Sequence, residues 1–243
     1  MTRHTVPVGP CSEWKSACEV QRRFMRHSPP AIDALDYGAQ CRQVYALGGN
    51  FYDFVSLAND RLAIAVGDAS GKGLAAALMI ANVQSSLRTA SLFARDNGPA
   101  ALDAVNRQVY GSSLADRYAT LFFGVFDSGK RTLRYVNAGH NPPMVIRRDK
   151  SILWLETGSA PVGMFPDWKY EEGIAALHPG DMVLAYTDGV IEAINPDGEE
   201  WGLEGLRRTA AECGARCADE VVNAIVRTMD EYKDGLCCTW SST

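Results

Sequence analysis

The stretch Gly67-Asp68-Ala69-Ser70-Gly71-Lys72-Gly73 lies between an apolar segment, Leu62 to Val66, and a long alanine-rich segment, Leu74 to Ala94. This pattern predicts a buried strand, a glycine-rich turn and a helix. A carboxylate at the end of a buried strand is held rigidly, which makes Asp68 a candidate functional residue. An anion-binding turn at the helix N-terminus is the alternative. The stretch lacks the P-loop spacing GxxxxGK[ST], which argues against nucleotide binding by that route.

A second acidic residue follows an apolar segment in Thr187-Asp188-Gly189, directly after Met182 to Tyr186. Taken alone, a strand-end Asp-Gly is a common turn. Two strand-end carboxylates in one chain predict a shared metal site, because Mg²⁺ and Mn²⁺ prefer oxygen ligands. The chain has only 4 histidines, which argues against a histidine-rich zinc or iron site.

Two further motifs combine glycines with polar side chains. Gly48-Gly49-Asn50-Phe51-Tyr52-Asp53 predicts a tight entry into a strand that carries Asp53. Asn137-Ala138-Gly139-His140-Asn141-Pro142-Pro143 predicts a polar turn between strands. A lone histidine in such a turn is more often structural than catalytic.

Composition narrows the class of protein. The 243 residues fit one large domain, and 47% of them are hydrophobic. A net charge of −5 argues against nucleic-acid binding. No apolar run approaches the roughly 20 residues of a membrane span, and Met1 to Pro10 does not have the pattern of a signal peptide. The 7 cysteines include no CxxC pair, which favours reduced thiols in a cytoplasmic protein.

The order of predicted elements indicates an α+β protein. Strands are expected at 35–45, 51–57, 61–66, 119–127, 132–137, 143–147, 152–155, 173–177 and 182–187, and helices at 12–26, 74–94, 99–110, 203–213 and 218–232. Asn59-Asp60 predicts a hairpin turn. Alternating βαβ units are absent, which favours a layered domain with mainly antiparallel sheets. We expect a tail at 1–11 and one domain at 12–243 that includes the leading helix.

In this order and spacing, the motifs resemble the SpoIIE-like branch of the PPM (protein phosphatase 2C-like) metal-dependent phosphatases. The similarity runs from Ala17 to Tyr232. It also includes Glu19-Val20-Gln21-Arg22-Arg23, Ala160-Pro161-Val162-Gly163, Gly180-Asp181, Val190-Ile191-Glu192-Ala193 and Gly198-Glu199-Glu200-Trp201-Gly202.

The resemblance implies an α-β-β-α sandwich with two Mn²⁺ or Mg²⁺ ions at one end. By position, Asp68 would bridge both metals, the Ala69 carbonyl would help to bind one, and Asp188 would bind the other. The reaction implied is attack on phosphorus by metal-activated water. Asp68, Asp188, Asn50 and Asp53 are the expected catalytic residues.

The chain departs from this family's pattern at two places. Family members have Asp where this chain has Asn50, which carries no charge and should hold a cation less well; Asp53 is expected to compensate in part. At the C-terminus, two alignments are open. Either Tyr232 and Gly235 match the family's final helix end, and the Asp pair and last strand are missing, or Asp234 is the metal-binding Asp and the strand is short.

Three functions are compatible with these features. An active phosphatase would act on a phosphoserine or phosphothreonine protein, which the resemblance implies is a STAS-type anti-anti-sigma factor. Control would come from a partner or from homodimerisation through the 12–26 helix. A weakened or inactive phosphatase-like binding module in the same signalling pathway is the second hypothesis. Hydrolysis of small phosphate esters is the third.

Overall fold

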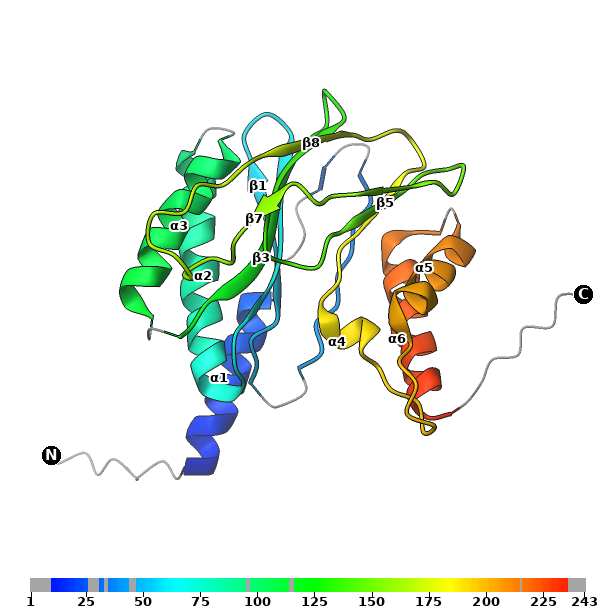
Figure 1. The fold of residues 1–243 in the computed structure, drawn as a ribbon, viewed down its shortest axis with the longest axis horizontal. Coiled ribbons are helices and arrows are strands. Elements are labelled where there is room, and N and C mark those ends of the chain that lie inside the picture. Colours follow the sequence, from blue (N-terminus) through cyan, green and yellow to red (C-terminus); the bar gives the residue numbers. More distant parts are fainter. Residues whose placement is uncertain are drawn as a thin grey trace, which may run out of the picture.

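Two stacked sheets with helices on both outer faces make up the computed structural model (Figure 1). The residues described are 10–25, 31–32, 35–43, 47–94, 97–113, 116–214 and 216–235. The predicted α+β class and the predicted α-β-β-α order of layers are both confirmed.

The first sheet has the strand order β1-β2-β3-β4-β7, and β8 also pairs with β4. Its strands are β1 (Phe51–Leu57), β2 (Arg61–Ala69), β3 (Ala119–Asp127), β4 (Thr132–Ala138), β7 (Gly158–Ser159) and β8 (Gly173–Ala176). Only the β4–β7 pair is parallel among the strand pairs described. The second sheet has the antiparallel order β6-β5-β9, formed by β5 (Met144–Ile146), β6 (Ile152–Trp154) and β9 (Met182–Leu184).

Three apolar layers hold the four structural layers together. Helices α2 (Gly73–Phe93) and α3 (Gly98–Ser112) pack on the first sheet. Helices α5 (Gly202–Cys213) and α6 (Ala218–Lys233) pack on the second. Between the sheets lies a third cluster, which includes Leu62, Phe122 and Leu133. Helix α1 (Pro10–Met25) lies against α2, and the short α4 (Asp188–Ile191) follows β9.

Side-chain alternation along β2 decides where Asp68 points. Successive residues of a strand face opposite sides of the sheet. Ala63 and Ala65 pack toward α2 and α3, whereas Leu62 and Ile64 pack between the sheets. Asp68 has the same parity as Leu62 and Ile64, so it lies on the side that faces the second sheet.

Several predicted elements differ from those observed. The strand expected at Leu35 to Tyr45 is absent from its described part, 35–43. Leu35 and Tyr37 instead pack at the edge of the inter-sheet core without forming a ladder, and Asp36 Oδ2 accepts a hydrogen bond from the Ala218 N–H at 2.7 Å. Helix α1 begins at Pro10, two residues before the expected Ser12. The hairpin turn at Asn59-Asp60 is confirmed, with φ of 61° and 52°.

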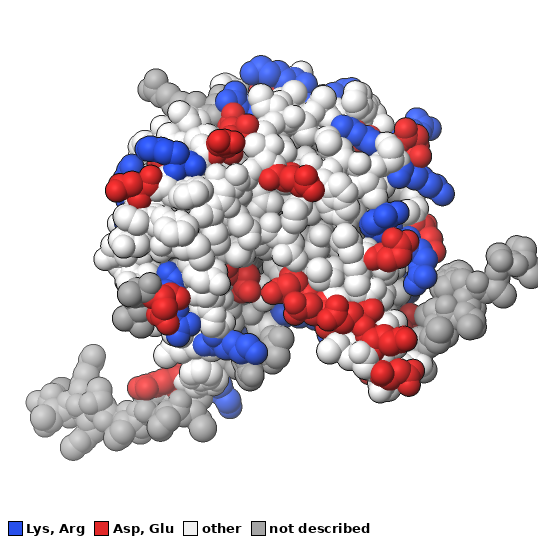
Figure 2. Space-filling view, viewed as in Figure 1, with Lys and Arg blue, Asp and Glu red and all other residues white. Residues whose placement is uncertain are grey.

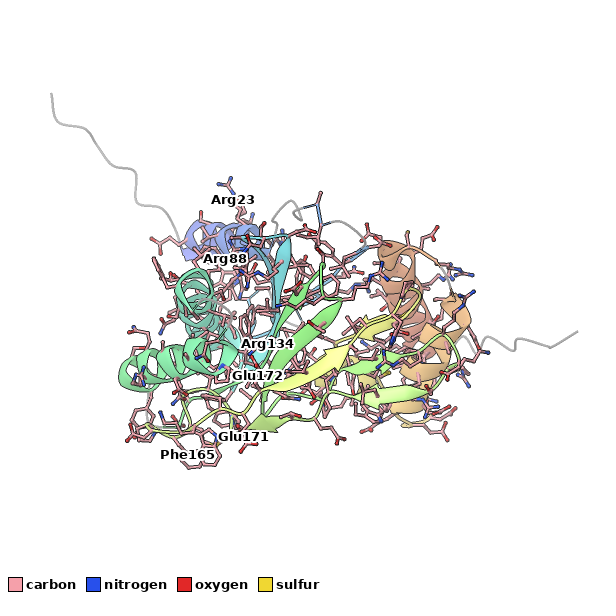
Figure 3. The ribbon with its side chains drawn as sticks, turned by 90° about the horizontal axis from the view of Figure 1, so that it is seen from above. Arg23, Arg88, Arg134, Phe165, Glu171 and Glu172 are labelled. Carbon is pink, nitrogen blue, oxygen red and sulfur yellow. The ribbon has the colours of Figure 1, made fainter. Side chains whose placement is uncertain are left out.

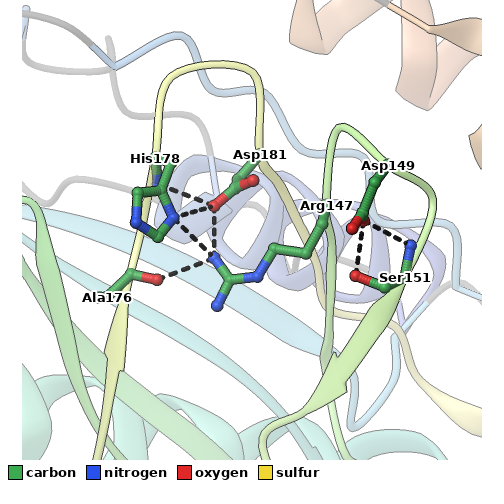
Figure 4. Close-up of polar contacts among 6 residues, drawn as sticks. All are labelled: Arg147, Asp149, Ser151, Ala176, His178 and Asp181. Carbon is green, nitrogen blue, oxygen red and sulfur yellow. Dashed lines mark hydrogen bonds and ion pairs between the residues drawn. The ribbon is translucent and has the colours of Figure 1, made fainter.

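A hydrogen bond from an ion-paired arginine joins the two sheets at the end of β9 that is far from Asp188 (Figure 4). Arg147 bonds to Asp181 and donates to the Ala176 carbonyl of β8 at 2.8 Å. Asp181 also accepts the His178 backbone N–H at 2.7 Å. These bonds outweigh burial and lower the pKa of the Asp181 carboxyl. Asp181 therefore belongs to the scaffold.

None of the helices in the described ranges is long and apolar enough to cross a membrane.

Candidate functional site

Asp68 lies near the end of β2, beside its ladder partner Thr120 on β3. Its carboxylate is half-buried, and burial raises its pKa to about 6 from an ordinary 3.8. The negative charge of Asp188 raises the pKa further, while a hydrogen bond from the Ala69 N–H opposes both effects. Asp68 is thus a rigidly placed carboxylate in a site that favours a compensating positive charge.

Asp188 comes from the other sheet. It is the first residue of α4, four residues after Leu184, where β9 ends. Its side chain is exposed, and Oδ1 accepts the Gly189 N–H at 2.8 Å. Because its charge acts on Asp68, the structure brings the two predicted strand-end carboxylates to one site.

The Gly48-Gly49-Asn50 segment closes against Asp68. The Ala69 N–H donates to the Gly49 carbonyl at 3.2 Å. A Cβ atom at Gly49 would lie 2.7 Å from Asp68 Oδ1 and 2.9 Å from the Ala69 carbonyl oxygen, so only glycine fits this approach. The side-chain oxygen of Asn50 is buried and has no hydrogen-bond partner among the described residues.

Asp53 is not brought to Asp68, which corrects the expectation that it compensates for Asn50. It faces α2 and is 3% exposed. Arg88 Nε donates to its Oδ2 at 2.5 Å and Arg88 Nη2 donates to its Oδ1, while Gln84 Nε2 lies 3.1 Å from Oδ2. Figure 3 shows Arg88 on the helix side of the first sheet. The parity of β1 is the reason: Asp53 shares a face with Phe51, which packs in the α2–α3 core.

Asp234 lies at the end of α6, where its backbone N–H donates to the Asp230 carbonyl at 3.1 Å. It is exposed, and among the described residues it is not one of the charges that act on Asp68. The short last strand considered for the C-terminus lies beyond residue 235, outside the described residues.

His140 is a site residue for which the motif pattern predicted a structural role rather than a catalytic one. It is 6% exposed, and its Nδ1 lies 3.1 Å from Thr120 Oγ1. Its Nε2 is buried without a hydrogen-bond partner among the residues described. Burial lowers the pKa of the imidazole to about 4, while the Tyr186 main chain and the Asp188 charge act in the opposite direction. The feature of the sequence that could have indicated a fixed histidine is Asn137, three residues earlier. Its Oδ1 accepts the backbone N–H of His140 at 2.7 Å.

The donor set fits a hard divalent cation. Asp68, Asp188 and the Ala69 carbonyl are all oxygen donors, which Mg²⁺ and Mn²⁺ prefer, with water completing their coordination. Within the described ranges, no group of three or more His, Cys, Asp or Glu side chains is arranged to hold a metal. The protein would therefore supply few charged ligands.

Acidic side chains gather around α4 and the turn that follows it (Figure 2). Asp188, Glu192, Asp197, Glu199 and Glu200 are all exposed there. A surface of one charge sign raises the local concentration of oppositely charged ions. The negative charge around α4 therefore favours cations next to Asp188.

Comparison with known proteins gives the family. The family model described as "Stage II sporulation protein E (SpoIIE)" matches residues 58–237. Protein IcfG from Synechocystis sp. is 28% identical over 92% of this chain, and the chain spans 39% of that protein's length. The phosphoserine phosphatase RsbU from Bacillus subtilis is also 28% identical over 92% of this chain, which spans 66% of RsbU. The chain thus spans less than two thirds of the length of either relative.

The fold matches that of a solved phosphatase domain. The SiaA-PP2C domain of Pseudomonas aeruginosa superposes with a TM-score of 0.75 at 19% identity, over 92% of this chain and 90% of that domain. At this identity the match concerns the fold alone. The chain therefore belongs to the SpoIIE family and has a PP2C-like fold, as its motifs predicted.

Proposed function

We propose that the protein is a metal-dependent phosphatase that removes phosphate from phosphoserine or phosphothreonine on a regulatory protein. The observation that carries this proposal is the meeting of Asp68 and Asp188, from different sheets, at a site that favours positive charge. Membership of the SpoIIE family and the similarity to RsbU support it.

Asp68, the Ala69 carbonyl and Asp188 are the residues proposed to hold Mn²⁺ or Mg²⁺, with two ions expected and Asp234 as a further candidate ligand. When bound, the ions supply positive charge that acidifies water and neutralises phosphoryl oxygens. The β2–β3 ladder fixes Asp68, and Gly49 allows the neighbouring loop to approach it. Preorganised carboxylates of this kind need little rearrangement when a substrate arrives.

A weakened phosphatase is the second candidate, because two groups expected to act beside Asp68 supply no charge there. Asn50 is neutral, and Asp53 is engaged by Arg88 on the other face of β1. Each missing carboxylate lowers the affinity of the site for a divalent ion. If the affinity for metal is too low for catalysis, the protein would bind its partner without hydrolysing the phosphate.

A phosphatase assay separates these candidates. With Mn²⁺, the protein should hydrolyse p-nitrophenyl phosphate and dephosphorylate a phosphorylated STAS-type protein, and a chelator should abolish both activities. Asp68→Ala should be inactive, whereas the exposed control Asp167→Ala should match the wild type. Asn50→Asp should raise activity. Full activity of Asp68→Ala would remove the metal mechanism, and activity on the small ester alone would favour a small-molecule phosphatase.

The STAS-type substrate is proposed because the family resembled by the motifs acts on such proteins, and a cytoplasmic location follows from that pathway. We also propose that 12–243 forms the phosphatase domain and that α1 supports a homodimer. On α1, Trp14, Val20 and Phe24 are each more than 40% exposed, which leaves an apolar face available. Sedimentation of the wild type and Val20→Arg tests this: the variant should be monomeric, and a monomeric wild type would overturn the dimer.

A further inference from the structure

His140 occupies a buried position between the two strand ends that carry the candidate metal ligands. Its Nδ1 contacts Thr120, the ladder partner of Asp68, at 3.1 Å. The Tyr186 main chain and the Asp188 carboxylate are also close enough to affect its pKa. The imidazole therefore contacts a residue of the first sheet and lies near the segment that follows β9 in the second sheet.

The position of the ring is itself fixed. The backbone N–H of His140 donates to Asn137 Oδ1 at 2.7 Å, and the His140 side chain is 6% exposed. Gly139, with φ of 69°, turns the chain beside Pro161, where a Cβ atom would come within 2.7 Å of the proline ring. The turn thus holds the imidazole in one place.

The environment also indicates which nitrogen carries the proton. The Thr120 hydroxyl lies closer to Nδ1, at 3.1 Å, than to the Asp68 carbonyl, at 3.4 Å. If the hydroxyl donates to Nδ1, the ring proton is on Nε2, next to the Tyr186 main chain and the Asp188 charge. A buried polar atom without a partner costs about 1–3 kcal/mol, so an Nε2 that lacks one among the described residues calls for an explanation.

We propose that His140 is a positioning residue: through the contact of its Nδ1 with Thr120, the ladder partner of Asp68, it holds Asp68 in the place that divalent-metal binding requires. The inference rests on the proposed function, because it assumes a metal site at Asp68 and Asp188. Groups behind metal ligands commonly change metal affinity by about 10–100-fold when they are removed.

Three variants of His140 and two of Thr120 test this role through Mn²⁺ affinity, measured by calorimetry, and through the free energy of unfolding of the metal-free protein. The Gln side-chain amide reaches the position of Nε2, the Asn amide reaches that of Nδ1, and Phe supplies the ring without either nitrogen. His178→Phe is the control, because His178 is an exposed histidine at the opposite end of β9.

The expected order of Mn²⁺ affinity is wild type, then His140→Asn, which keeps a polar group at the position of Nδ1, then His140→Gln and His140→Phe. We expect His140→Phe to bind Mn²⁺ about 10–100-fold more weakly, and His178→Phe to match the wild type. Thr120→Val should also weaken binding, whereas Thr120→Ser should retain it. The last two variants keep the test valid if His140→Phe does not fold.

Three results would overturn the inference. If every folded His140 variant binds Mn²⁺ as the wild type does, His140 only fills space. If affinity merely follows the loss of stability across the series, its role is general packing. If Gln retains binding and Asn does not, the contact of Nδ1 with Thr120 is not what positions Asp68. A wild type that binds no Mn²⁺ would instead be a failure of the proposed function.

Discussion

The Asp53–Arg88 pair allows a sharp test of how β1 is oriented. Arg88 makes two hydrogen bonds to a carboxylate that is 3% exposed, while its own side chain is 34% exposed. Removing one partner of a buried ion pair costs about 3–5 kcal/mol, because a charge is left buried without compensation. Since Gln84 and the Phe54 N–H still bond to Asp53, we expect Arg88→Met to cost about 3 kcal/mol, the lower end of that range.

The double variant Asp53→Leu/Arg88→Met should lose less free energy of unfolding than the two single variants lose together, with a coupling energy of about 2 kcal/mol. Urea unfolding of the metal-free proteins at neutral pH gives these values, and the denaturant dependence should not change. In the phosphatase assay, Asp53→Asn should keep its kcat per folded molecule within about twofold, since the side chain lies away from the site. Unchanged stability of Asp53→Asn together with a large loss of kcat would refute this reasoning and return Asp53 to the catalytic site.

Three further predictions follow from Asp68, Gly49 and Phe122. In the presence of a chelator, Asp68→Asn should be more stable than the wild type at neutral pH. The reason is the raised pKa of the Asp68 carboxyl, about 6: its stabilising contribution is present below pH 3.8 and is lost as the pH rises through about 6. The full pKa change corresponds to about 3 kcal/mol, and solvent screening of the half-buried group reduces the expected gain to about 1 kcal/mol; thermal unfolding at several pH values should show the gain shrinking toward pH 4, and a constant gain would contradict this cause. Gly49→Ala should weaken Mn²⁺ binding in calorimetry, because its Cβ would displace Asp68 Oδ1, whereas unchanged binding would show that the loop can yield. Phe122→Ala should cost about 3–5 kcal/mol in urea unfolding, because Phe122 is 1% exposed between the sheets, and a cost below 1 kcal/mol would contradict that placement.

Much of the fold was predictable because local patterns agreed with the final layers. The apolar segments before Asp68 and Asp188 end at carboxylates, and both carboxylates reach one site. The Asn59-Asp60 turn carries residues that tolerate positive φ, and it joins the strands as expected.

Other features depend on contacts that no local pattern encodes. Asp53 lies between aromatic residues, so alternation along β1 could not reveal its face, and its partner Arg88 is 35 residues away. The 35–43 segment has a strand-like composition, but no described strand forms a hydrogen-bonded ladder with it. Helix α4 has four residues, which is too short for a helical period to be recognised.

The central claim is that Asp68 and Asp188 together hold divalent metal. The most direct test is calorimetric titration of Mn²⁺ into the wild type, Asp68→Asn, Asp188→Asn and the exposed control Asp167→Asn. The wild type and the control should bind Mn²⁺ alike, Asp68→Asn should lose most binding, and Asp188→Asn should lose part of it. Equal binding by all four proteins, or no binding by the wild type, would contradict the claim.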